Sequence, residues 1–349
     1  MPTVLDNQKA ISRIDSRDML GAVEKLPEFI QIQLDDEGRK LEEIRSKDFH
    51  DVVLMGMGGS ASAADVTLDW LSNKISIPAI VHRDPGIPRF VGADTLLIAL
   101  SYSGETRETL AAFREARKRG SSLIGIGTGG KLREHSKELG IPFVDVLSAP
   151  APRAALGQMI VACANALHGC GIIQNPTAEI ELVVKELRRL NYRVGSETPL
   201  SDNPAKRLAS SLKDRMPVVF AFRRIASVAR RFKNQLAENS KMTAKYSLLP
   251  EAAHNEIEGW HNPHLPFAPM FVRDPFESLF EKSMLHSFQS TIGKASGIRS
   301  EQVRLNSKTR LGSLLSPILY LDYVSVYLAL LRGLDPTDTP WIRRYKSGL

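Results

Sequence analysis

The chain has 349 residues, of which 43% are hydrophobic and 24% are charged, an ordinary composition for a soluble globular protein. Its length predicts two domains, each large enough to bury a core. The net charge of +7 is compatible with anionic substrates, whereas the scattered basic residues and the lack of a basic, aromatic-rich platform argue against nucleic-acid binding.

The first part of the chain predicts helices followed by an alternating α/β unit. Residues 1 to about 45 are expected to be helical and amphipathic, with a break at Leu26-Pro27. From 51 to about 150, apolar strands alternate with helices, which is typical of a doubly wound parallel sheet covered on both faces. Strands are expected at 51–55, 78–81, 95–100, 122–126 and 142–146, with helices at 60–68, 108–119 and 131–139.

A glycine-rich turn follows the first of these strands. Gly56, Gly58 and Gly59 stand between the strand and a helix that begins near Ser60. The free N–H groups and the dipole of a helix N-terminus favour an anion at such a turn. The stretch from Gly56 to Ala61 also fits the glycine pattern of a dinucleotide site, although the acidic residue of that motif comes late. This turn alone leaves a dinucleotide, another anion and a purely structural role open.

A second polar loop, SYSGET at 101–106, follows the strand at 95–100. The carboxyl ends of parallel strands share one edge of the sheet, and ligands bind there in open α/β folds. Neither loop contains a lysine, and the Walker motif GxxxxGK[ST] does not occur. Hydroxyl and amide donors suit a compact phosphate monoester, and a dinucleotide has no need of this second loop. We therefore expect a sugar phosphate here, in preference to NAD.

The second half of the chain repeats the α/β pattern without the glycine turn. A helix is expected at 154–168, a solvated connector helix at 177–191 and a junction at 195–204. Where the first unit has its glycines, Arg223-Arg224 follows the next strand. This second unit is therefore expected to keep the fold and lack the phosphate loop. Strands are expected at 216–222, 267–272 and 302–305, with helices at 225–241, 277–294 and 313–333.

Several patterns argue against metal, secreted and membrane classes. Cys163 and Cys170 lie about 10 Å apart along one predicted helix, too far for a disulfide. Neither these cysteines nor His261 and His264 form a recognisable zinc pattern. The N-terminus lacks the apolar core of a secretory signal. The apolar run at 314–331 is interrupted by polar residues and a proline, so we expect a buried helix, no membrane association and a cytoplasmic protein.

Four polar residues are candidates for acid–base chemistry, each with an ordinary structural alternative. Glu238 ends a helix, where the dipole disfavours an acid; alternatively it is a surface carboxylate. His254 opens the polar stretch HNEIEGW, where Asn255 is alternatively a helix cap beside a surface histidine. Arg153 lies at a strand-to-helix junction from which it can reach an anionic intermediate, or it is a surface arginine. Lys346 lies in the C-terminal tail, where fraying is the ordinary expectation.

Taken together, these segments resemble a known family. The motifs GMGGSA, SYSGET, APRAAL, ENSK, HNEIEGW and DPTDTPWIRRYK occur in the order found in the bifunctional phosphoglucose/phosphomannose isomerases of archaea and bacteria. The resemblance runs from about residue 50 to the C-terminus. It implies two αβα-sandwich sugar isomerase (SIS) domains in tandem, each with a flavodoxin-like parallel sheet. We expect an N-terminal domain with the phosphate loops at 1–155, connecting helices at 156–200 and a C-terminal domain with the catalytic residues at 201–349.

The resemblance also implies a role for each candidate residue. Glu238 would move a proton between C1 and C2 through a cis-enediol, and Arg153 would stabilise the enediolate. His254, contributed by the neighbouring subunit of a homodimer, would assist ring opening with Lys346 nearby. Thr339 matches a threonine that leaves room for substrates epimeric at C2. The sugar phosphate would be held by Gly58, Gly59, Ser60, Ser101, Ser103 and Thr106.

The implied activity is the interconversion of glucose 6-phosphate, and of mannose 6-phosphate, with fructose 6-phosphate, without a metal or redox cofactor. Two alternatives stay open. A non-catalytic SIS sensor would keep the SYSGET loop but would not need Glu238, His254 and Lys346. A different SIS isomerase would act on an amino sugar or a pentose phosphate. The family's commoner ENAK is ENSK here, which bears on substrate preference more than on reaction type.

Overall fold

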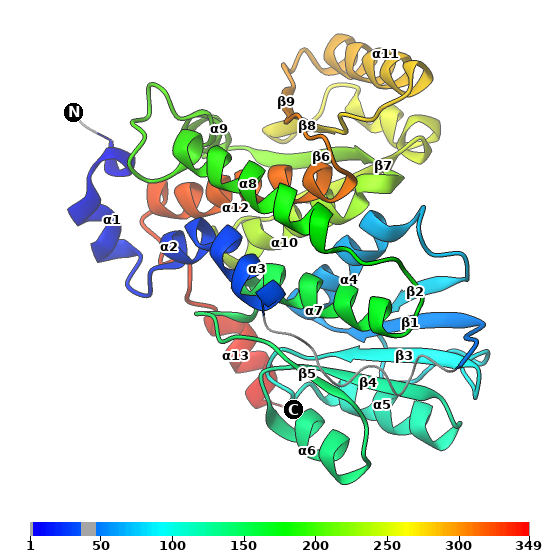
Figure 1. Cartoon of the computed structure of the whole chain (residues 1–349). Coiled ribbons are helices and arrows are strands. Elements are labelled where there is room, and N and C mark those ends of the chain that lie inside the picture. Colours follow the sequence, from blue (N-terminus) through cyan, green and yellow to red (C-terminus); the bar gives the residue numbers. More distant parts are fainter. Residues whose placement is uncertain (1–2, 36–46, 349) are drawn as a thin grey trace. The chain divides into compact units, whose positions relative to one another are not determined.

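The chain forms two compact units, shown in a computed structural model that describes residues 3–35 and 47–348 (Figure 1). Unit 2 covers Lys25–Lys185, and unit 1 combines Met1–Glu24 with Glu186–Leu349. The units therefore differ from the contiguous ranges 1–155, 156–200 and 201–349 expected from the sequence, because the first helices pack with the last part of the chain. The three ranges 1–155, 156–200 and 201–349 remain a prediction of where the family's two domains begin and end in this chain.

The N-terminal helices begin and end close to the predicted break. Helix α2 ends at Glu24 and α3 begins at Leu26, so the break lies at Lys25, one residue before the predicted Leu26-Pro27, and Pro27 lies in the first turn of α3. Residues 36–46 of the predicted helical stretch lie outside the described residues. The described elements are η1 (Val4–Asp6), α1 (Gln8–Ile14), α2 (Met19–Glu24) and α3 (Leu26–Asp35).

Unit 2 is the predicted doubly wound α/β unit. Its strands pair in parallel in the order β2-β1-β3-β4-β5, so β2 and β3 lie on opposite sides of β1 and the order in which strands are added reverses between β1 and β3. Helices α4 and α7 cover one face of this sheet, and α5 and α6 cover the other (Figure 1). The elements are β1 (Asp51–Gly56), α4 (Gly58–Leu71), β2 (Ala79–His82), β3 (Thr95–Leu100), α5 (Arg107–Lys118), β4 (Ser122–Gly127), α6 (Gly130–Glu138), β5 (Phe143–Asp145), η3 (Pro152–Ala155) and α7 (Leu156–Gly169). Helix α8 (Thr177–Val194) begins in unit 2 and ends in unit 1.

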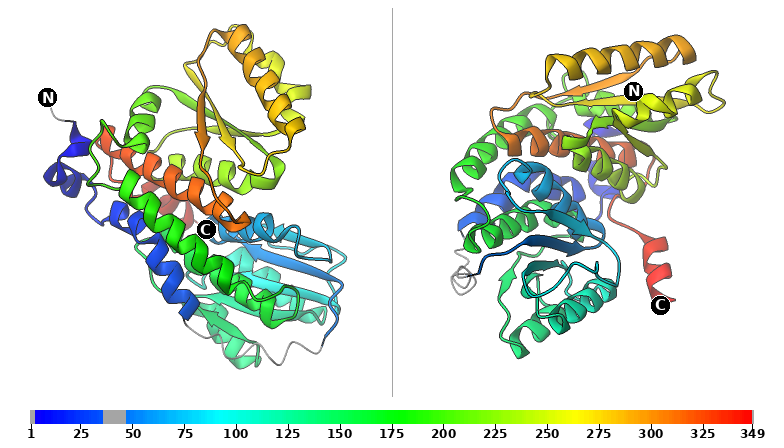
Figure 2. Two further views of the ribbon diagram at one scale, coloured as in Figure 1. Left: turned by 45° about the horizontal axis from the view of Figure 1, so that its top comes forward. Right: turned by 90° about the vertical axis from the view of Figure 1, so that its right-hand side faces the viewer.

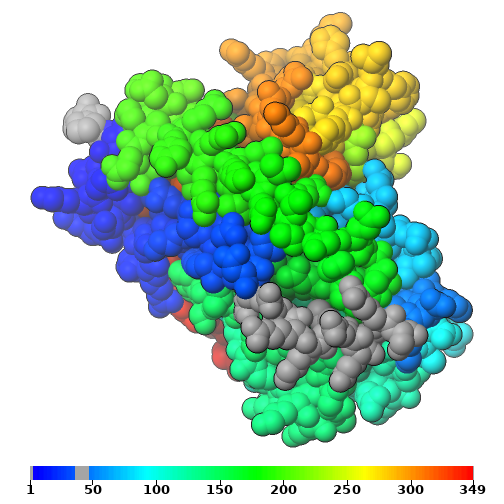
Figure 3. Space-filling view, in the orientation of Figure 1, coloured from blue at the N-terminus to red at the C-terminus, as the bar shows by residue number. Residues whose placement is uncertain are grey.

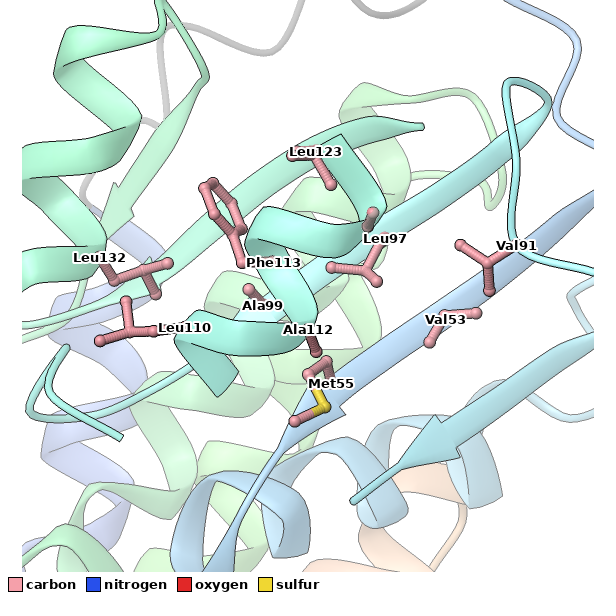
Figure 4. Packing of buried hydrophobic residues seen from close by; sticks show 11 residues of the cluster. Val53, Met55, Val91, Leu97, Ala99, Leu110, Ala112, Phe113, Leu123 and Leu132 are labelled. Carbon is pink, nitrogen blue, oxygen red and sulfur yellow. The ribbon is translucent and has the colours of Figure 1, made fainter. Parts of the chain in front are cut away.

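An apolar core packs α5 and α6 against the strands of unit 2. Figure 4 shows Val53 and Met55 of β1 and Leu97 of β3 beside Phe113 of α5 and Leu132 of α6. These side chains are all buried. Alternate residues of a parallel strand point to opposite faces, so near-continuous apolar strands such as β1 and β3 can contact helices on both sides. The core thus holds the carboxyl ends of the strands in register, and with them the polar loops.

Unit 1 contains the second parallel sheet, in the order β7-β6-β8-β9. Helix α11 packs on one face of it, and Figure 2 gives two further views of this layer. Helices α10 and α12 pack against each other, and α9 packs on α12. The elements are α9 (Pro204–Leu212), β6 (Met216–Phe222), η4 (Arg223–Ile225), α10 (Ala226–Glu238), β7 (Lys245–Leu249), η5 (Glu251–His254), η6 (Glu256–Trp260), β8 (Phe267–Arg273), α11 (Leu279–Ser296), β9 (Glu301–Arg304), α12 (Arg310–Leu331) and α13 (Pro340–Ser347).

Two predicted features of the long helices have different outcomes. Helix α12 is long and apolar, and 94% of its most apolar 18-residue stretch is buried, so the expectation of a buried core helix is confirmed. The expectation that α8 is a solvated connector was wrong for one of its faces. Val183, Val184 and Leu187 are buried, whereas Leu182 and Tyr192 are exposed. The outer face of α8 lies on the surface in Figure 3.

Candidate functional site

The two polar loops of unit 2 meet at the carboxyl edge of its sheet. Ser60 Oγ, in the first turn of α4, accepts a hydrogen bond of 3.1 Å from the backbone N–H of Tyr102. Ser101 Oγ donates to Thr106 Oγ1 at 3.1 Å, and Ser103 Oγ accepts from the N–H of Glu105 at 3.2 Å. The N-termini of α4 and α5 both open toward this edge. The arrangement gathers hydroxyl groups and helix-end N–H groups, which together suit an anion.

Two glycines allow these loops to approach their neighbours. Gly104 has φ +70°, and a β-carbon there would lie 1.8 Å from the carbonyl oxygen of Gly129. A β-carbon on Gly59 would lie 3.0 Å from the carbonyl oxygen of Pro152 and 3.2 Å from the N atom of Arg153. Only a residue without a side chain fits either position without a shift of backbone. Gly59 therefore brings the segment that carries Arg153 against the first turn of α4.

Arg153 is buried, with 5% of its surface exposed, in the short helix η3. It thus lies beside the loop of Gly58, Gly59 and Ser60, which confirms that these parts of unit 2 come together. The loops of 56–61 and 101–106 carry no basic residue, and Arg153 is the buried cation whose backbone lies against the first of them. The expectation of an ordinary surface arginine was wrong.

Glu238 ends helix α10 in unit 1, and the turn that follows this helix is bound by the residue after α12. Arg332, which follows α12, donates from Nη1 to the carbonyl oxygens of Ser240 at 2.6 Å and Lys241 at 3.2 Å. These bonds fix the turn that follows Glu238 and place a cation close to the C-terminal end of α10, where positive charge is favourable. Lys241, with φ +52°, turns the chain and donates from Nζ to the carbonyl oxygen of Asp335.

The residues after Glu238 are fixed to α12 by buried hydrogen bonds. Asn239 Nδ2 donates to Ser325 Oγ at 2.9 Å, and Ser240 Oγ donates to the carbonyl oxygen of Ser325 at 2.7 Å. Two turns earlier on α10, Arg231 binds both oxygens of Asp322 at 2.6–3.2 Å. The two side chains are 5% and 6% exposed. These contacts set the register of α10 on α12 and hence the position of Glu238.

The C-terminal candidates lie beyond α12. Thr339 is the N-cap residue of α13, and Lys346 lies in its last turn. All residues from Pro340 to Ser347 are exposed, including Trp341 and Tyr345. The tail is thus a short helix, and the expectation of a frayed terminus was wrong for this segment. The segment before it is joined to the end of α10 through the contact between Lys241 and Asp335.

His254 lies at the other end of the second sheet from Glu238. Helix α10 ends before β7 begins, whereas His254 follows the carboxyl end of β7. The strand β7 runs parallel to β6, and its five residues rise about 16 Å. His254 is exposed on η5 and Asn255 caps η6, so the predicted helix here is a pair of 3₁₀ turns. Within unit 1 the structure does not bring Glu238 and His254 together.

An ion-pair cluster stands at the carboxyl edge of the second sheet, where the first sheet has its phosphate loops. Asp274 Oδ2 accepts from Arg224 Nε at 2.7 Å and from Arg310 Nη1 at 2.8 Å. Arg224 also binds Glu281 at 2.9 Å. Although burial acts to raise it, hydrogen bonds from Ser278 and the charge of Arg224 lower the pKa of Glu281. This edge of the second sheet therefore carries paired charges of the chain itself.

The two cysteines are buried thiols, and Cys163 is hydrogen-bonded to the side chain of Thr67. Burial raises the pKa of Cys163 and of Cys170 to about 12. Both cysteines are free thiols, so the expectation that they form no disulfide is confirmed.

Sequence reasoning missed the residues that support the candidates. Tyr102, Asp322, Ser325 and Arg332 act through contacts with segments far away in the chain. The only signal in the sequence for Tyr102 is its position inside SYSGET. Polar residues within the very apolar helix α12 interrupt an apparent membrane span, but their partners on α10 cannot be inferred from spacing.

Comparison with family models identifies both halves of the chain. Residues 44–133 match the SIS domain, and residues 201–349 match the bacterial phospho-glucose isomerase C-terminal SIS domain. The fold is also found in the C-terminal domain of glucosamine-fructose-6-phosphate aminotransferase from Francisella tularensis. That structure superposes with a TM-score of 0.72 and 16% identity over 92% of this chain and 98% of that one.

Full-length relatives are closer in sequence. The bifunctional phosphoglucose/phosphomannose isomerase of Caldicellulosiruptor bescii is 35% identical over 95% of this chain and 98% of its own length. The protein of the same name from Aquifex aeolicus is 33% identical over 85% of this chain and 90% of its own length. The similarity therefore extends over both units of the chain.

Proposed function

Since the chain belongs to the bifunctional phosphoglucose/phosphomannose isomerase family, we propose that it interconverts glucose 6-phosphate and mannose 6-phosphate with fructose 6-phosphate. The enzyme is an intramolecular oxidoreductase, because the aldose carbonyl at C1 becomes a hydroxyl while the C2 hydroxyl becomes the ketone. The sugar phosphate would be the only substrate, and we assign the protein to the cytoplasm.

The phosphate is assigned to the loops of unit 2. Ser60, Ser101, Ser103 and Thr106 offer hydroxyl groups at one edge of the sheet, with Gly58 and Gly59 opening the backbone at the start of α4. Binding energy from this remote group can be used to orient C1 and C2 for proton transfer. Arg153, which is buried and whose backbone lies against Gly59, is assigned to stabilise the negative charge of the enediolate.

Glu238 is assigned as the base that carries the proton between C1 and C2. The turn directly after this carboxylate is fixed by Arg332, and Asn239 and Ser240 bind it to α12. A fixed position matters because proton transfer requires the base within hydrogen-bond reach of the carbon-bound proton. Lys346 is assigned to ring opening together with a histidine, and Thr339 to the space that admits both C2 epimers.

One observation carries the assembly proposal: Glu238 and His254 lie at opposite ends of β7. One chain thus supplies the base and the histidine at separate places about a strand length apart. Two copies related by a two-fold axis can exchange an exposed residue, so that the histidine of one copy completes the site of the other. We therefore assign the protein as a homodimer in which His254 serves the neighbouring subunit.

The activity is tested by measuring fructose 6-phosphate formation from glucose 6-phosphate and from mannose 6-phosphate, with EDTA present. Wild type should convert both sugars, and Glu238→Gln should lower kcat by about 10²–10⁴-fold because it removes the base. Asp214→Asn, which changes an exposed carboxylate of the same unit away from the candidate residues, is the control and should retain activity. Binding of the sugar phosphate without turnover in wild type would instead indicate a non-catalytic sensor or another substrate.

The shared site is tested by mixing Glu238→Gln with His254→Asn after unfolding and refolding them together. If the histidine acts in the neighbouring subunit, each mixed dimer contains one site with both residues intact. Random pairing should then restore about one quarter of the wild-type activity. If both residues act within one chain, no mixed site is intact and activity stays at the level of the separate variants.

A further inference from the structure

Tyr102 connects the loops at the carboxyl edge of the first sheet. Its N–H donates to Ser60 Oγ at 3.1 Å. Its carbonyl oxygen accepts from Thr128, both from the N–H at 2.8 Å and from Oγ1 at 2.7 Å. Its phenol oxygen accepts from the N–H of Ala149 at 2.8 Å and donates to the carbonyl oxygen of Ala149 at 2.9 Å. One residue of the SYSGET loop thus binds the connections that follow β1, β4 and β5.

The phenol contact fixes the segment that leads to Arg153. Ala149 lies in the irregular connection between β5 and η3, and both of its backbone polar groups are used by the phenol. A few residues later, the backbone of Pro152 and Arg153 lies against Gly59. The segment is therefore held at two points, by the Tyr102 side chain before the arginine and by the glycine turn at the arginine itself.

The phenol is already engaged, which separates positioning from direct binding. A phenol has one proton, and here that proton goes to the carbonyl oxygen of Ala149. It is thus not free to donate to a phosphate in the same arrangement. Its ring is half-buried, so loss of the oxygen alone leaves the packing of the ring in place.

We propose that Tyr102 is a positioning residue for Arg153, joining the phosphate loop to the arginine that stabilises the enediolate. This inference rests on the proposed isomerase function. An electrostatic group must stand at the place where charge develops, and a misplacement of about 1 Å can cost on the order of 10²-fold in rate. The phosphate contacts, which come from the backbone and hydroxyls of the loop, do not depend on the phenol oxygen.

The test is Tyr102→Phe, which removes only the phenol oxygen and keeps the backbone bonds to Ser60 and Thr128. We expect kcat to fall about 10-fold or more while KM for glucose 6-phosphate changes less than about 2-fold. Tyr246→Phe makes the same chemical change in unit 1, where the phenol accepts from Arg230 Nε at 3.0 Å, and should leave both constants unchanged. A rise in KM without a fall in kcat would overturn the proposal, because it would assign the phenol to substrate binding.

A double-mutant cycle identifies the residue through which Tyr102 acts. In an Arg153→Lys background, Tyr102→Phe should have little further effect on kcat, because the group that it positions is already altered. Two effects that simply multiply would refute the connection. Hydrogen–deuterium exchange of the peptide around Ala149 gives a readout independent of catalysis. Faster exchange there in Tyr102→Phe is expected even if wild type proves inactive on these sugars, so failure of the function and failure of this inference are distinguishable.

Discussion

The buried ion pair between α10 and α12 gives a sharp stability prediction. Arg231 and Asp322 make bidentate contacts, and their side chains are 5% and 6% exposed. Removing one partner leaves the other charge buried without its counter-ion, which costs about 3–5 kcal/mol. Asp322→Ala should therefore lower the free energy of unfolding of unit 1 by this amount and its Tm by roughly 6–20 °C.

A matched surface pair provides the control. Asp338 binds Arg343 at 2.6 Å, with side chains 44% and 60% exposed. Solvent screens this pair, so Asp338→Ala should cost about 0–1 kcal/mol. Replacing both members of the buried pair, as Arg231→Met with Asp322→Leu, should recover most of the loss, because no unpaired charge then remains inside.

The assay is urea unfolding followed by the fluorescence of Trp260, which is buried in unit 1. All variants carry Trp70→Phe and Trp341→Phe, which remove the buried tryptophan of unit 2 and the exposed one of α13, so that Trp260 alone reports. The reasoning would be refuted if Asp322→Ala unfolded at the same urea concentration as Asp338→Ala. It would also be refuted if the apolar double variant were no more stable than Asp322→Ala, since the cost would then not come from the unpaired charge.

Three further predictions concern other parts of the chain. Gly104→Ala should raise KM for glucose 6-phosphate about 10-fold or more, because the new β-carbon clashes with the carbonyl oxygen of Gly129 at the phosphate loop. Gly171→Ala is the control and should leave KM unchanged, because Gly171 also has a positive φ but no atom lies within 4 Å of its β-carbon position. Cys163 and Cys170 should resist iodoacetamide at pH 8 in the native enzyme, because burial raises their pKa to about 12, and alkylation should be seen by mass spectrometry only after unfolding. The folded-state pKa of Glu281 is lowered, so its charge stabilises the fold at pH values above the ordinary Glu pKa of about 4.3. Wild type should therefore be more stable than Glu281→Gln in urea unfolding at such pH values. This difference in stability should disappear as the pH falls through the lowered pKa.

The strands of unit 2 were predictable because they are buried on both faces. In an alternating α/β pattern, a continuous apolar run of six residues bounded by turns, such as 95–100, is too short for a helix and fits a central parallel strand. Strand β7 (Lys245–Leu249) was missed because it is an edge strand that begins with an exposed lysine, so its hydrophobic signal is weak. Helix α9 was missed for a similar reason, since Pro204 and nearby polar residues indicate a junction although Pro is favoured in a first helical turn.

The candidate site was only partly predictable for a different reason. Its loops are recognisable, because Ser60 and the SYSGET loop are short motifs at strand ends. The roles of Glu238 and His254 came from resemblance, since an acid at a helix end and an exposed histidine are common in any protein. The contacts that hold Glu238 in place, such as the bond from Arg332 to the turn after α10, depend on which distant segments meet in the fold. Local spacing carries no information about such pairs.

The composition of unit 1 has a consequence for biosynthesis. Residues 1–24 leave the ribosome first, yet Leu5, Met19 and Leu20 are buried in a unit whose remaining parts are made last. Both η1 and α2 pack against α12, near the end of the chain. Unit 2 can therefore form its contacts during synthesis, whereas the apolar residues of the N-terminal helices stay exposed until α12 has been made. An N-terminal tag or truncation would act on the last folding step, not the first.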